Sequence, residues 1–407
     1  MAGLDFDIPP YITRPIYVRR LEPLVGKDVI KVLVGQRRVG KSYLLHHVVD
    51  MIRKRDPACP VLYVNKELAA FDDIRTHADL LDLTRRQLGS APRGCILVDE
   101  VQEIENWSRA LRSLAAEKRF DLYCTGSNAE MLSGDIATLL AGRAVEVPVR
   151  GLSYGEFLAF HRLDESDESL RRYLRYGGLP HLVDLELTDR VVYEYLGNLY
   201  HVILFKDVVA RYRIRNIDFL ERLVRFVADS VGSVVTAKRI SDYLKSQRVR
   251  ISPNAVLEYL AHLCHACFLA KVHRADVVGR RIFEIGEKYY FEDLGLRHAV
   301  KPFVQQDIGK VLENLVYHHL RVCGWQVAAG RLDRREIDFV ATRQEETLYV
   351  QVAYLLTDAA THAREFGNLL DIPDNYPKLV VSMDPVIGAS HKGIRHLHIR
   401  EFLSTEW

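Results

Sequence analysis

The sequence predicts an α/β protein of several domains, with a parallel β-sheet in its N-terminal part. Three observations lead to this fold class. An apolar run at 29–34 is followed by a glycine-containing loop and then by a helical pattern at 43–49. Two further apolar runs, at 95–98 and 120–125, have the character of buried parallel strands. With 407 residues the chain is too long for a single core, so we expect two to four domains.

The loop after the first strand has the pattern Gly-x-x-x-x-Gly-Lys-Ser at residues 35–42. Backbone N–H groups of such a loop turn inward around an anion, and the next helix adds the partial positive charge of its N-terminus. Lys41 would reach the β- and γ-phosphates, and the Ser42 hydroxyl would hold Mg²⁺. The sequence therefore predicts binding of ATP with Mg²⁺. The residues expected around the nucleotide are Gly35, Arg38, Val39, Gly40, Lys41, Ser42 and Tyr43.

Two acids, Asp99 and Glu100, end the apolar strand that begins at Cys95. Asp99 would orient the Mg²⁺ shell through water or Ser42. Glu100 would activate the water that attacks the γ-phosphate. Strands of one parallel sheet end at the same edge, so we expect this pair to face the phosphate loop and to make the protein an ATPase.

The strand at 120–125 leads into Gly126-Ser127-Asn128, where a polar side chain would sense the γ-phosphate. Asn128 or Ser127 is the candidate, although both residue types also favour helix N-caps. Arg143 precedes a further strand at 144–147, a position from which a neighbouring subunit's nucleotide can be reached. Its guanidinium would neutralise developing phosphate charge in trans. The alternative is an ordinary surface arginine.

Composition is that of a soluble globular protein, with 48% hydrophobic and 27% charged residues. No apolar run approaches the ~18 residues of a membrane helix. The N-terminus lacks the basic and apolar regions of a signal peptide. Six cysteines are scattered among apolar neighbours, which indicates reduced thiols and a cytoplasmic location. Net charge is only +2, but residues 230–290 hold ten Lys and Arg against five Asp and Glu.

The chain resembles a large bacterial and archaeal family of AAA-type ATPases. The resemblance covers nearly the whole chain and implies an AAA+-like P-loop ATPase core, a helical lid, a winged helix and a C-terminal domain similar to PD-(D/E)XK nucleases. The stretches that carry it are 35–42, 96–100, 125–128, 142–143, 152–157, 176–180, 206–208 and 336–340.

The domain limits expected from this resemblance are 1–150 for the ATPase, 151–228 for the lid, 229–300 for the winged helix and 301–407 for the nuclease-like domain. Residues 151–228 have the helical spacing that a lid requires.

In the expected winged helix, two amphipathic helices start near Thr236 and Ser252, and strands at 269–273 and 281–285 flank a wing. Gly279, Arg280 and Arg281 tip the wing. The excess of basic residues suits duplex phosphates, although many winged helices in ATPases only pack against other domains. Cys264 and Cys267 could hold zinc with nearby histidines, but no second ligand pair follows, so core packing is favoured.

A nuclease of this type needs a helix Glu, a strand Asp and a Glu-x-Lys on the next strand, because carboxylates hold Mg²⁺ and the lysine activates water. Glu313 and Asp338 match the first two positions, but Gln351 and Ala353 replace the Glu and the Lys. Alternation would place Ile337 and Phe339 on one face of the strand and Asp338 on the other. Lys310 or Lys378 could substitute for the missing lysine. We expect a nuclease-like fold that binds nucleic acid or a partner and cuts poorly.

These features predict a cytoplasmic ATPase that forms a homo-oligomer, with a hexameric ring as one form, and that binds duplex or branched DNA in order to remodel or process it. No membrane partner is expected. The alternative is a nucleotide-dependent signalling switch whose C-terminal domain binds a protein partner.

Overall fold

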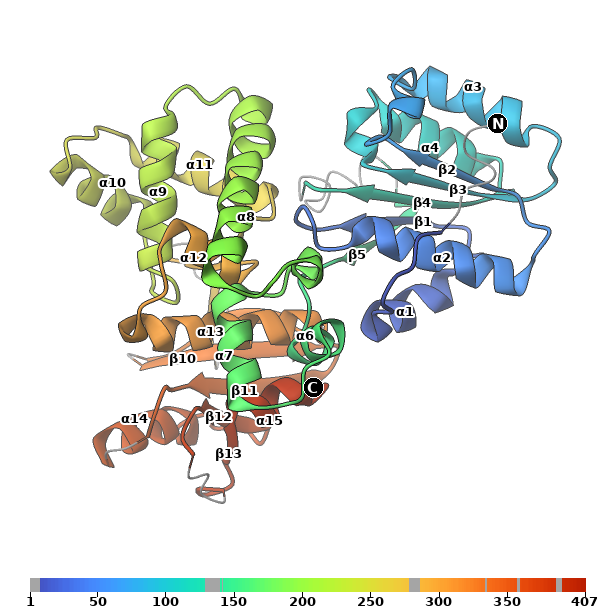
Figure 1. The fold of residues 1–407 in the computed structure, drawn as a ribbon. Helices are drawn as coiled ribbons and strands as arrows, with labels where there is room; N and C mark the ends of the chain where they lie inside the picture. The colour runs from blue at the N-terminus through green and yellow to red at the C-terminus, as the bar shows by residue number, and fades with distance from the viewer. Residues whose placement is uncertain are drawn as a thin grey trace. The chain divides into compact units, whose positions relative to one another are not determined.

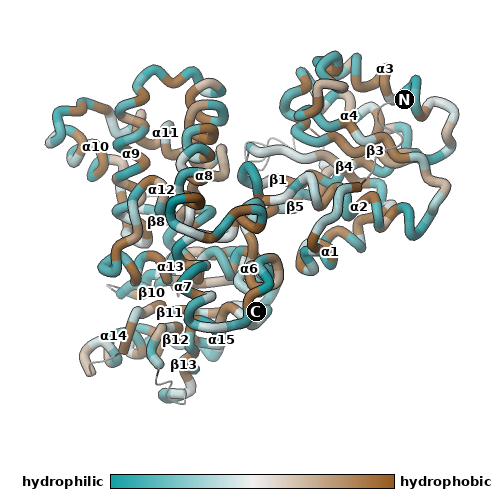
Figure 2. The backbone as a smooth tube through the Cα atoms, viewed as in Figure 1, coloured by the Kyte–Doolittle hydropathy of each residue, from teal (hydrophilic) through white to brown (hydrophobic). Residues whose placement is uncertain are grey.

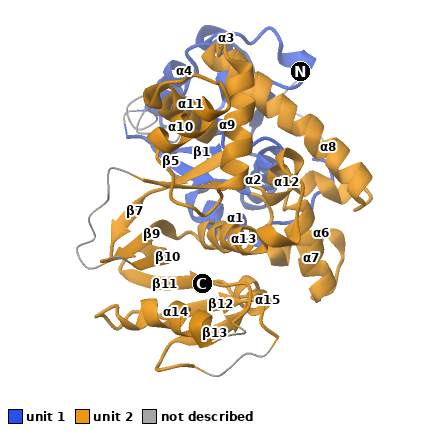
Figure 3. Cartoon of the chain, turned by 90° about the vertical axis from the view of Figure 1, so that its left-hand side faces the viewer, with its two compact units in different colours: residues 1–150, 265–267 blue, residues 151–264, 268–407 orange. Residues whose placement is uncertain are grey.

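The computed structural model describes residues 8–128, 140, 142–277, 286–333, 335–356, 359–385 and 390–407. Two compact units make up the chain: residues 1–150 with 265–267, and residues 151–264 with 268–407 (Figure 3). Within these described ranges, no helix is long and apolar enough to cross a membrane.

A five-stranded parallel sheet forms the centre of the first unit (Figure 1). Its spatial order is β2 (Val61–Asn65), β3 (Gly94–Asp99), β4 (Phe120–Gly126), β1 (Ile30–Val34) and β5 (Ala144–Pro148). Every residue of β1 and β3 is buried, because helices cover both faces of the sheet. The strands predicted from the three apolar runs are therefore confirmed, and β4 lies between β1 and β3.

The helices of this unit cover the sheet from two sides. Figure 1 shows α3 (His77–Leu88) and α4 (Trp107–Ala116) on one face, and α1 (Pro15–Leu21) and α2 (Lys41–Arg55) on the other. Alternate residues of β1, namely Ile30, Val32 and Val34, belong to the core shared with α3 and α4. The central strands accordingly stand out as hydrophobic in Figure 2. A capping box between Thr76 and Asp79 satisfies the first N–H groups of α3 and fixes where that helix begins.

Helices dominate the first part of the second unit. They are α6 (Tyr154–His161), α7 (Asp167–Tyr176), α8 (Asp189–Val202), the π-helical segment η6 (Ile203–Ala210), α9 (Ile217–Asp229) and α12 (Leu294–Val300). A close joint connects α7 to α12. Buried Asp293 accepts hydrogen bonds from the N–H groups of Leu296 (3.0 Å) and Gly178 (2.8 Å). A Cβ on Gly177 would lie 2.5 Å from Asp293 Oδ1, so only glycine fits the end of α7.

The segment expected to be a winged helix contains α10 (Ala237–Ser246), α11 (Pro253–His265) and an antiparallel pair of β6 (Leu269–Val272) with β8 (Lys288–Phe291). The expected wing tip at 279–281 and strand at 281–285 lie outside the described residues. A short strand, β7 (Arg274–Asp276), joins the C-terminal sheet by pairing with β9. The winged helix stays a prediction. Cys267 lies beyond the end of α11 with φ 51°, so it does not share a helix face with Cys264.

The C-terminal part contains a six-stranded mixed sheet. Its order is β13 (Arg395–His398), β12 (Lys378–Ser382), β11 (Glu346–Val352), β10 (Arg335–Arg343), β9 (Gln326–Leu332) and β7. The helices α13 (Ile308–Val322) and α14 (Ala359–Leu370) both pack against this sheet, and α15 (Ile399–Ser404) follows β13.

The simple alternation expected along β10 is wrong. Ile337 packs in the cluster that contains Phe366 of α14. Phe339 instead lies 6.3 Å from the ring of Tyr317 on α13. A register irregularity between Ile337 and Val340 interrupts the pairing of β10 with β9, and this kind of bulge changes the direction of the following side chains.

We predict that His298 makes the second unit sensitive to acid. Its Nδ1 lies 3.1 Å from Arg297 Nη1, which can only donate, so Nε2 must carry the proton that is donated to the Leu174 carbonyl (3.0 Å). Burial and the charge of Arg297 lower the pKa of His298 to about 3. The unfolded chain therefore binds one more proton below about pH 6.5, and the free energy of unfolding falls as pH falls.

His298→Gln should remove up to about 1.4 kcal/mol per pH unit from this slope between pH 6 and 4. Urea unfolding of the wild type and the variant at a series of pH values measures it. His201→Gln, at an exposed histidine, is the matched control and should keep the wild-type slope. Equal slopes for His298→Gln and the wild type would contradict the prediction.

Candidate nucleotide site

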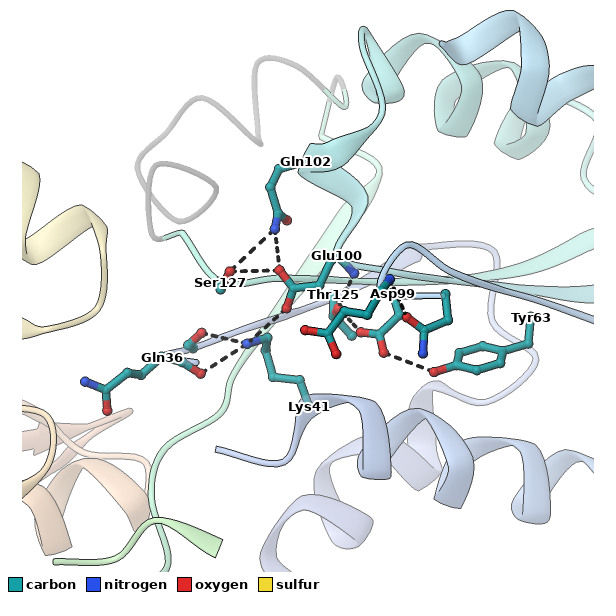
Figure 4. Close-up of polar contacts among 11 residues, drawn as sticks. Gln36, Lys41, Tyr63, Asp99, Glu100, Gln102, Thr125 and Ser127 are labelled. Atoms are coloured by element: carbon teal, nitrogen blue, oxygen red, sulfur yellow. Dashed lines mark hydrogen bonds and ion pairs between the residues drawn. The ribbon is translucent and has the colours of Figure 1, made fainter. Parts of the chain in front are cut away.

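The phosphate loop begins where the buried strand β1 ends. A Cβ on Gly35 would lie 2.0 Å from the Val149 carbonyl oxygen, so this position accepts only glycine. Gly40 has φ 89° and stands at the N-cap of α2. Lys41 Nζ donates to the carbonyl oxygens of Gly35 (3.0 Å) and Gln36 (3.1 Å), so the ammonium lies inside the loop (Figure 4). The side-chain amide of Gln36 points away from it.

Arg14 braces this loop from the N-terminal side. Its side chain is 4% exposed, and Nη1 donates to the carbonyl oxygens of Val39 (3.0 Å) and Arg150 (2.9 Å). The Tyr17 hydroxyl accepts a hydrogen bond from the Arg150 N–H (2.8 Å), and the Arg14 guanidinium lies 4.4 Å from the centre of the Tyr17 ring. The segment around α1 therefore holds the loop in place, a role that no local pattern in the sequence indicates.

Asp99 lies at the carboxyl end of β3, where it accepts hydrogen bonds from two neighbouring strands. The Tyr63 hydroxyl of β2 donates to Oδ2 (3.0 Å), and the Thr125 hydroxyl of β4 donates to Oδ1. The same Thr125 oxygen accepts from the Glu100 N–H (2.9 Å). Thr125 thus joins both acids to the strand that separates them from the phosphate loop.

Glu100 is held by three groups. Its carboxylate accepts hydrogen bonds from Ser127 Oγ (2.8 Å) and Gln102 Nε2, and Oε1 lies 3.7 Å from Lys41 Nζ (Figure 4). Burial alone would raise the pKa of Glu100, but Lys41 and these two hydrogen bonds outweigh burial and lower it. The carboxylate is therefore ionised at neutral pH and can accept a proton.

Ser127, one of the two candidates for a γ-phosphate sensor, contacts Glu100. Asn128 is buried and follows it directly, and its sensor role stays a prediction. Sequence reasoning missed the roles of Thr125 and Tyr63, because sheet pairing brings each of them to Asp99. It also missed Gln102, which contacts Glu100 from two positions away in the sequence.

Arg143 directly precedes β5, at the amino-terminal end of the parallel strands, whereas the phosphate loop follows the carboxyl-terminal end of β1. It is exposed, and its carbonyl oxygen accepts from the N–H of Ile30, the first residue of β1. β1 and β5 are parallel, with Ile30 paired to Ala144 and Val34 to Pro148. The start of β5 is therefore about 13 Å along the strand from the loop at its far end. The role of Arg143 in trans stays a prediction.

Mg²⁺ would be held by Ser42 on the first turn of α2 and by Asp99. The described residues contain no group of three or more His, Cys, Asp or Glu side chains suited to a metal. A phosphate-bound Mg²⁺ does not need one, because it takes one or two protein oxygens and completes its shell with phosphate and water. Tyr43 is 50% exposed beside this turn, and its contact with the nucleotide stays a prediction.

The nuclease-like residues also come together, on the C-terminal sheet. The Asp338 N–H donates to Gln351 Oε1 (3.3 Å), and Asp338 Oδ2 accepts from the Val352 N–H (2.8 Å). Glu313 of α13 lies across from them, and both acids contact Lys288, whose Nζ is 2.7 Å from Glu313 Oε1 and 3.9 Å from Asp338 Oδ1. The sequence offered no reason to select this lysine of β8.

The two lysines considered as substitutes lie elsewhere. Lys310 Nζ donates to the Asp229 carbonyl (2.6 Å), and Lys378 Nζ donates to the Ile372 carbonyl (3.2 Å). The expectation that either one substitutes for the missing lysine is therefore wrong. The lysine that contacts Glu313 and Asp338 is Lys288.

Comparison with known proteins agrees with the nucleotide site. An AAA domain matches residues 27–158, and a domain of unknown function (DUF8612) matches residues 167–307. An uncharacterized protein of Haemophilus influenzae is 32% identical over 400 residues, which cover 96% of this chain and 98% of that protein. An uncharacterized protein of Methanocaldococcus jannaschii is 27% identical over 358 residues, 84% of this chain and 78% of that protein.

Two solved structures are similar to this chain at lower sequence identity. The Walker-type ATPase PABY2304 of Pyrococcus abyssi is 17% identical, with a TM-score of 0.49, over 70% of this chain and 94% of that one. The ORC1 protein of Aeropyrum pernix, solved in complex with DNA, is 13% identical, with a TM-score of 0.34, over 74% and 95%. The identity to the Haemophilus influenzae protein extends along nearly the whole of both chains. This chain therefore belongs to the same family as that protein, and its residues 27–158 form an AAA domain of the P-loop ATPase type.

Proposed function

We propose that this protein hydrolyses ATP and binds duplex or branched DNA, and that it couples hydrolysis to remodelling or processing of that DNA. The observation that carries the ATPase part is the convergence of Lys41, Asp99 and Glu100 from the ends of two strands separated only by β4. Loop N–H groups and Lys41 bind the β- and γ-phosphates. Mg²⁺ at Ser42 and Asp99 supplies charge neutralisation.

Glu100 is the general base in this proposal. Its lowered pKa keeps it ionised, and Ser127 and Gln102 fix its orientation. Lys41 now bonds to two loop carbonyls, and phosphate oxygens are stronger acceptors for an ammonium than carbonyls. Nucleotide binding therefore draws Lys41 toward phosphate and leaves Glu100 free to take a proton from the attacking water.

The position of Arg143 supports an oligomer. Arg143 lies at the amino-terminal end of the strands, and its own phosphate loop lies at the carboxyl-terminal end. A guanidinium in this place serves catalysis only if a second copy of the chain brings its nucleotide to the amino-terminal end. Subunits arranged head to tail satisfy this requirement, and a closed ring is one such arrangement.

The basic surface of α10 and the turn after it supports DNA binding. Five exposed cations, Lys238, Arg239, Lys245, Arg248 and Arg250, occur there with a single acid, Asp242. The exposed ring of Tyr243 lies among them and is 42% exposed. Clustered cations on one face are the electrostatic footprint of a phosphate backbone.

Lys41→Ala and Glu100→Gln should fail in different ways. Loss of Lys41 removes the cation that the loop places against the phosphates, so ATP binding should be abolished. Glu100→Gln keeps the shape of the side chain and removes the base, so binding should persist while turnover falls by about 10²–10⁴-fold. Equilibrium binding of a fluorescent ATP analogue and steady-state phosphate release measure the two effects. Equal loss of affinity in both variants would show that these roles are misassigned.

Arg143→Ala should bind ATP normally and hydrolyse it slowly, by about 10³-fold or more if the guanidinium acts in trans. Mixing it with Glu100→Gln protein should restore part of the activity, because one type of interface in the mixture contains both wild-type residues. Arg85→Ala, at an exposed arginine of α3, is the control and should behave as wild type. Subunits that exchange without any recovery, or a monomer that hydrolyses ATP at full rate, would rule out catalysis in trans.

Arg248→Gln with Arg250→Gln should weaken DNA binding and reduce the slope of log affinity against log salt by about two, because each lost phosphate contact removes about 0.9. Arg85→Gln with Arg86→Gln changes charge equally on the exposed face of α3 and should leave the slope unchanged.

ATP turnover measured with duplex, forked and four-way DNA tests the coupling. Stimulation that the Arg248/Arg250 variant loses is expected. A wild-type protein that binds none of these DNAs at low salt would favour a signalling switch with a protein partner.

A further inference from the structure

We propose that the Lys288 ammonium is the resident cation of the acidic cluster formed by Glu313, Glu336 and Asp338, and that it closes this nuclease-like centre to divalent metal ions. The inference rests on the contacts of the C-terminal sheet and is independent of the proposed function.

Lys288 lies among the three acids of the cluster. Its Nζ lies 2.7 Å from Glu313 Oε1, 2.5 Å from Glu336 Oε1 and 3.9 Å from Asp338 Oδ1. The three acids come from α13 and β10, whereas the lysine comes from β8, so the ammonium enters the cluster from a different element. Its side chain is 1% exposed. A hydrated Mg²⁺ would have to displace the ammonium to reach these oxygens.

Neighbouring groups also cover both oxygens of Glu313 and one oxygen of Asp338. The hydroxyl of Tyr290, a fully buried residue, donates to Glu313 Oε1 (2.6 Å), the same oxygen that pairs with Lys288. A Cβ on Gly232 would lie 2.4 Å from Glu313 Oε2, so backbone covers the second oxygen. Asp338 Oδ2 accepts from the Val352 N–H. Mg²⁺ requires near-octahedral space for several waters, and around Glu313 this packing leaves little room for such a shell.

Two consequences follow for the C-terminal domain. The cluster connects the β6–β8 pair to the C-terminal sheet. Lys288 of β8 contacts Glu313 of α13 and Asp338 of β10. While the Lys288 ammonium occupies the space between these acids, the centre also does not carry out metal-dependent cleavage. The domain then contributes binding to nucleic acid or a partner.

Manganese binding to the full-length, nucleotide-free protein tests the proposal, with bound Mn²⁺ counted by electron paramagnetic resonance. The wild type and Asp338→Asn should bind the same number of Mn²⁺ ions. Lys288→Ala should bind one more equivalent, which Lys288→Ala with Asp338→Asn should lose. Lys271→Gln is the matched control: it removes a lysine of the same strand pair that contacts Glu287 at 2.7 Å on the surface, and it should gain no site.

Lys288→Gln is the second variant, because its amide can still donate to Glu313 if Lys288→Ala does not fold. Its melting temperature should fall below that of the wild type and recover in Mn²⁺. One Mn²⁺ lost from the wild type on Asp338→Asn would overturn the proposal, and this arm needs no Lys288 variant. So would folded Lys288 variants that gain no Mn²⁺. Multiple-turnover, Mn²⁺-dependent cutting of duplex or four-way DNA that disappears in Asp338→Asn would overturn it as well.

Discussion

The nucleotide site depends on the placement of β4 between β1 and β3. Parallel strands bring their carboxyl ends to one edge, so the phosphate loop after β1 and the acids after β3 lie one strand apart. Thr125 fills that separation by donating to Asp99 and accepting from the Glu100 N–H. The site is therefore positioned by backbone pairing in a fully buried sheet, and it persists only while that sheet is packed on both faces.

Two buried lysines show how similar contacts lead to different chemistry. Lys41 is held by two neutral carbonyls and lies 3.7 Å from one carboxylate, so an incoming polyanion can compete for it. Lys288 is surrounded by three carboxylates of its own chain, so no ligand is needed to balance its charge. In the first case burial prepares a cation for a ligand. In the second the cation is held in an ion network with acids of its own chain.

Two glycines allow neighbouring segments to approach closely. Gly35 admits the Val149 backbone beside the phosphate loop, and Gly177 admits the Asp293 carboxylate at the end of α7. Any side chain at these positions would collide with atoms that cannot move independently.

The sequence by itself determined the strands at 29–34, 95–98 and 120–125, the phosphate loop and the pair Asp99–Glu100, because continuous apolar runs and loop spacing are local signals. Tertiary structure alone decided the partners of those residues. Arg14 reaches the loop from 25 positions away, and Lys288 reaches Glu313 across the same separation. The side chain of Phe339 departs from its expected direction because a bulge, which alternation cannot reveal, interrupts β10. Contacts of this kind depend on which surfaces pack together after folding, and local sequence patterns do not show which surfaces those are.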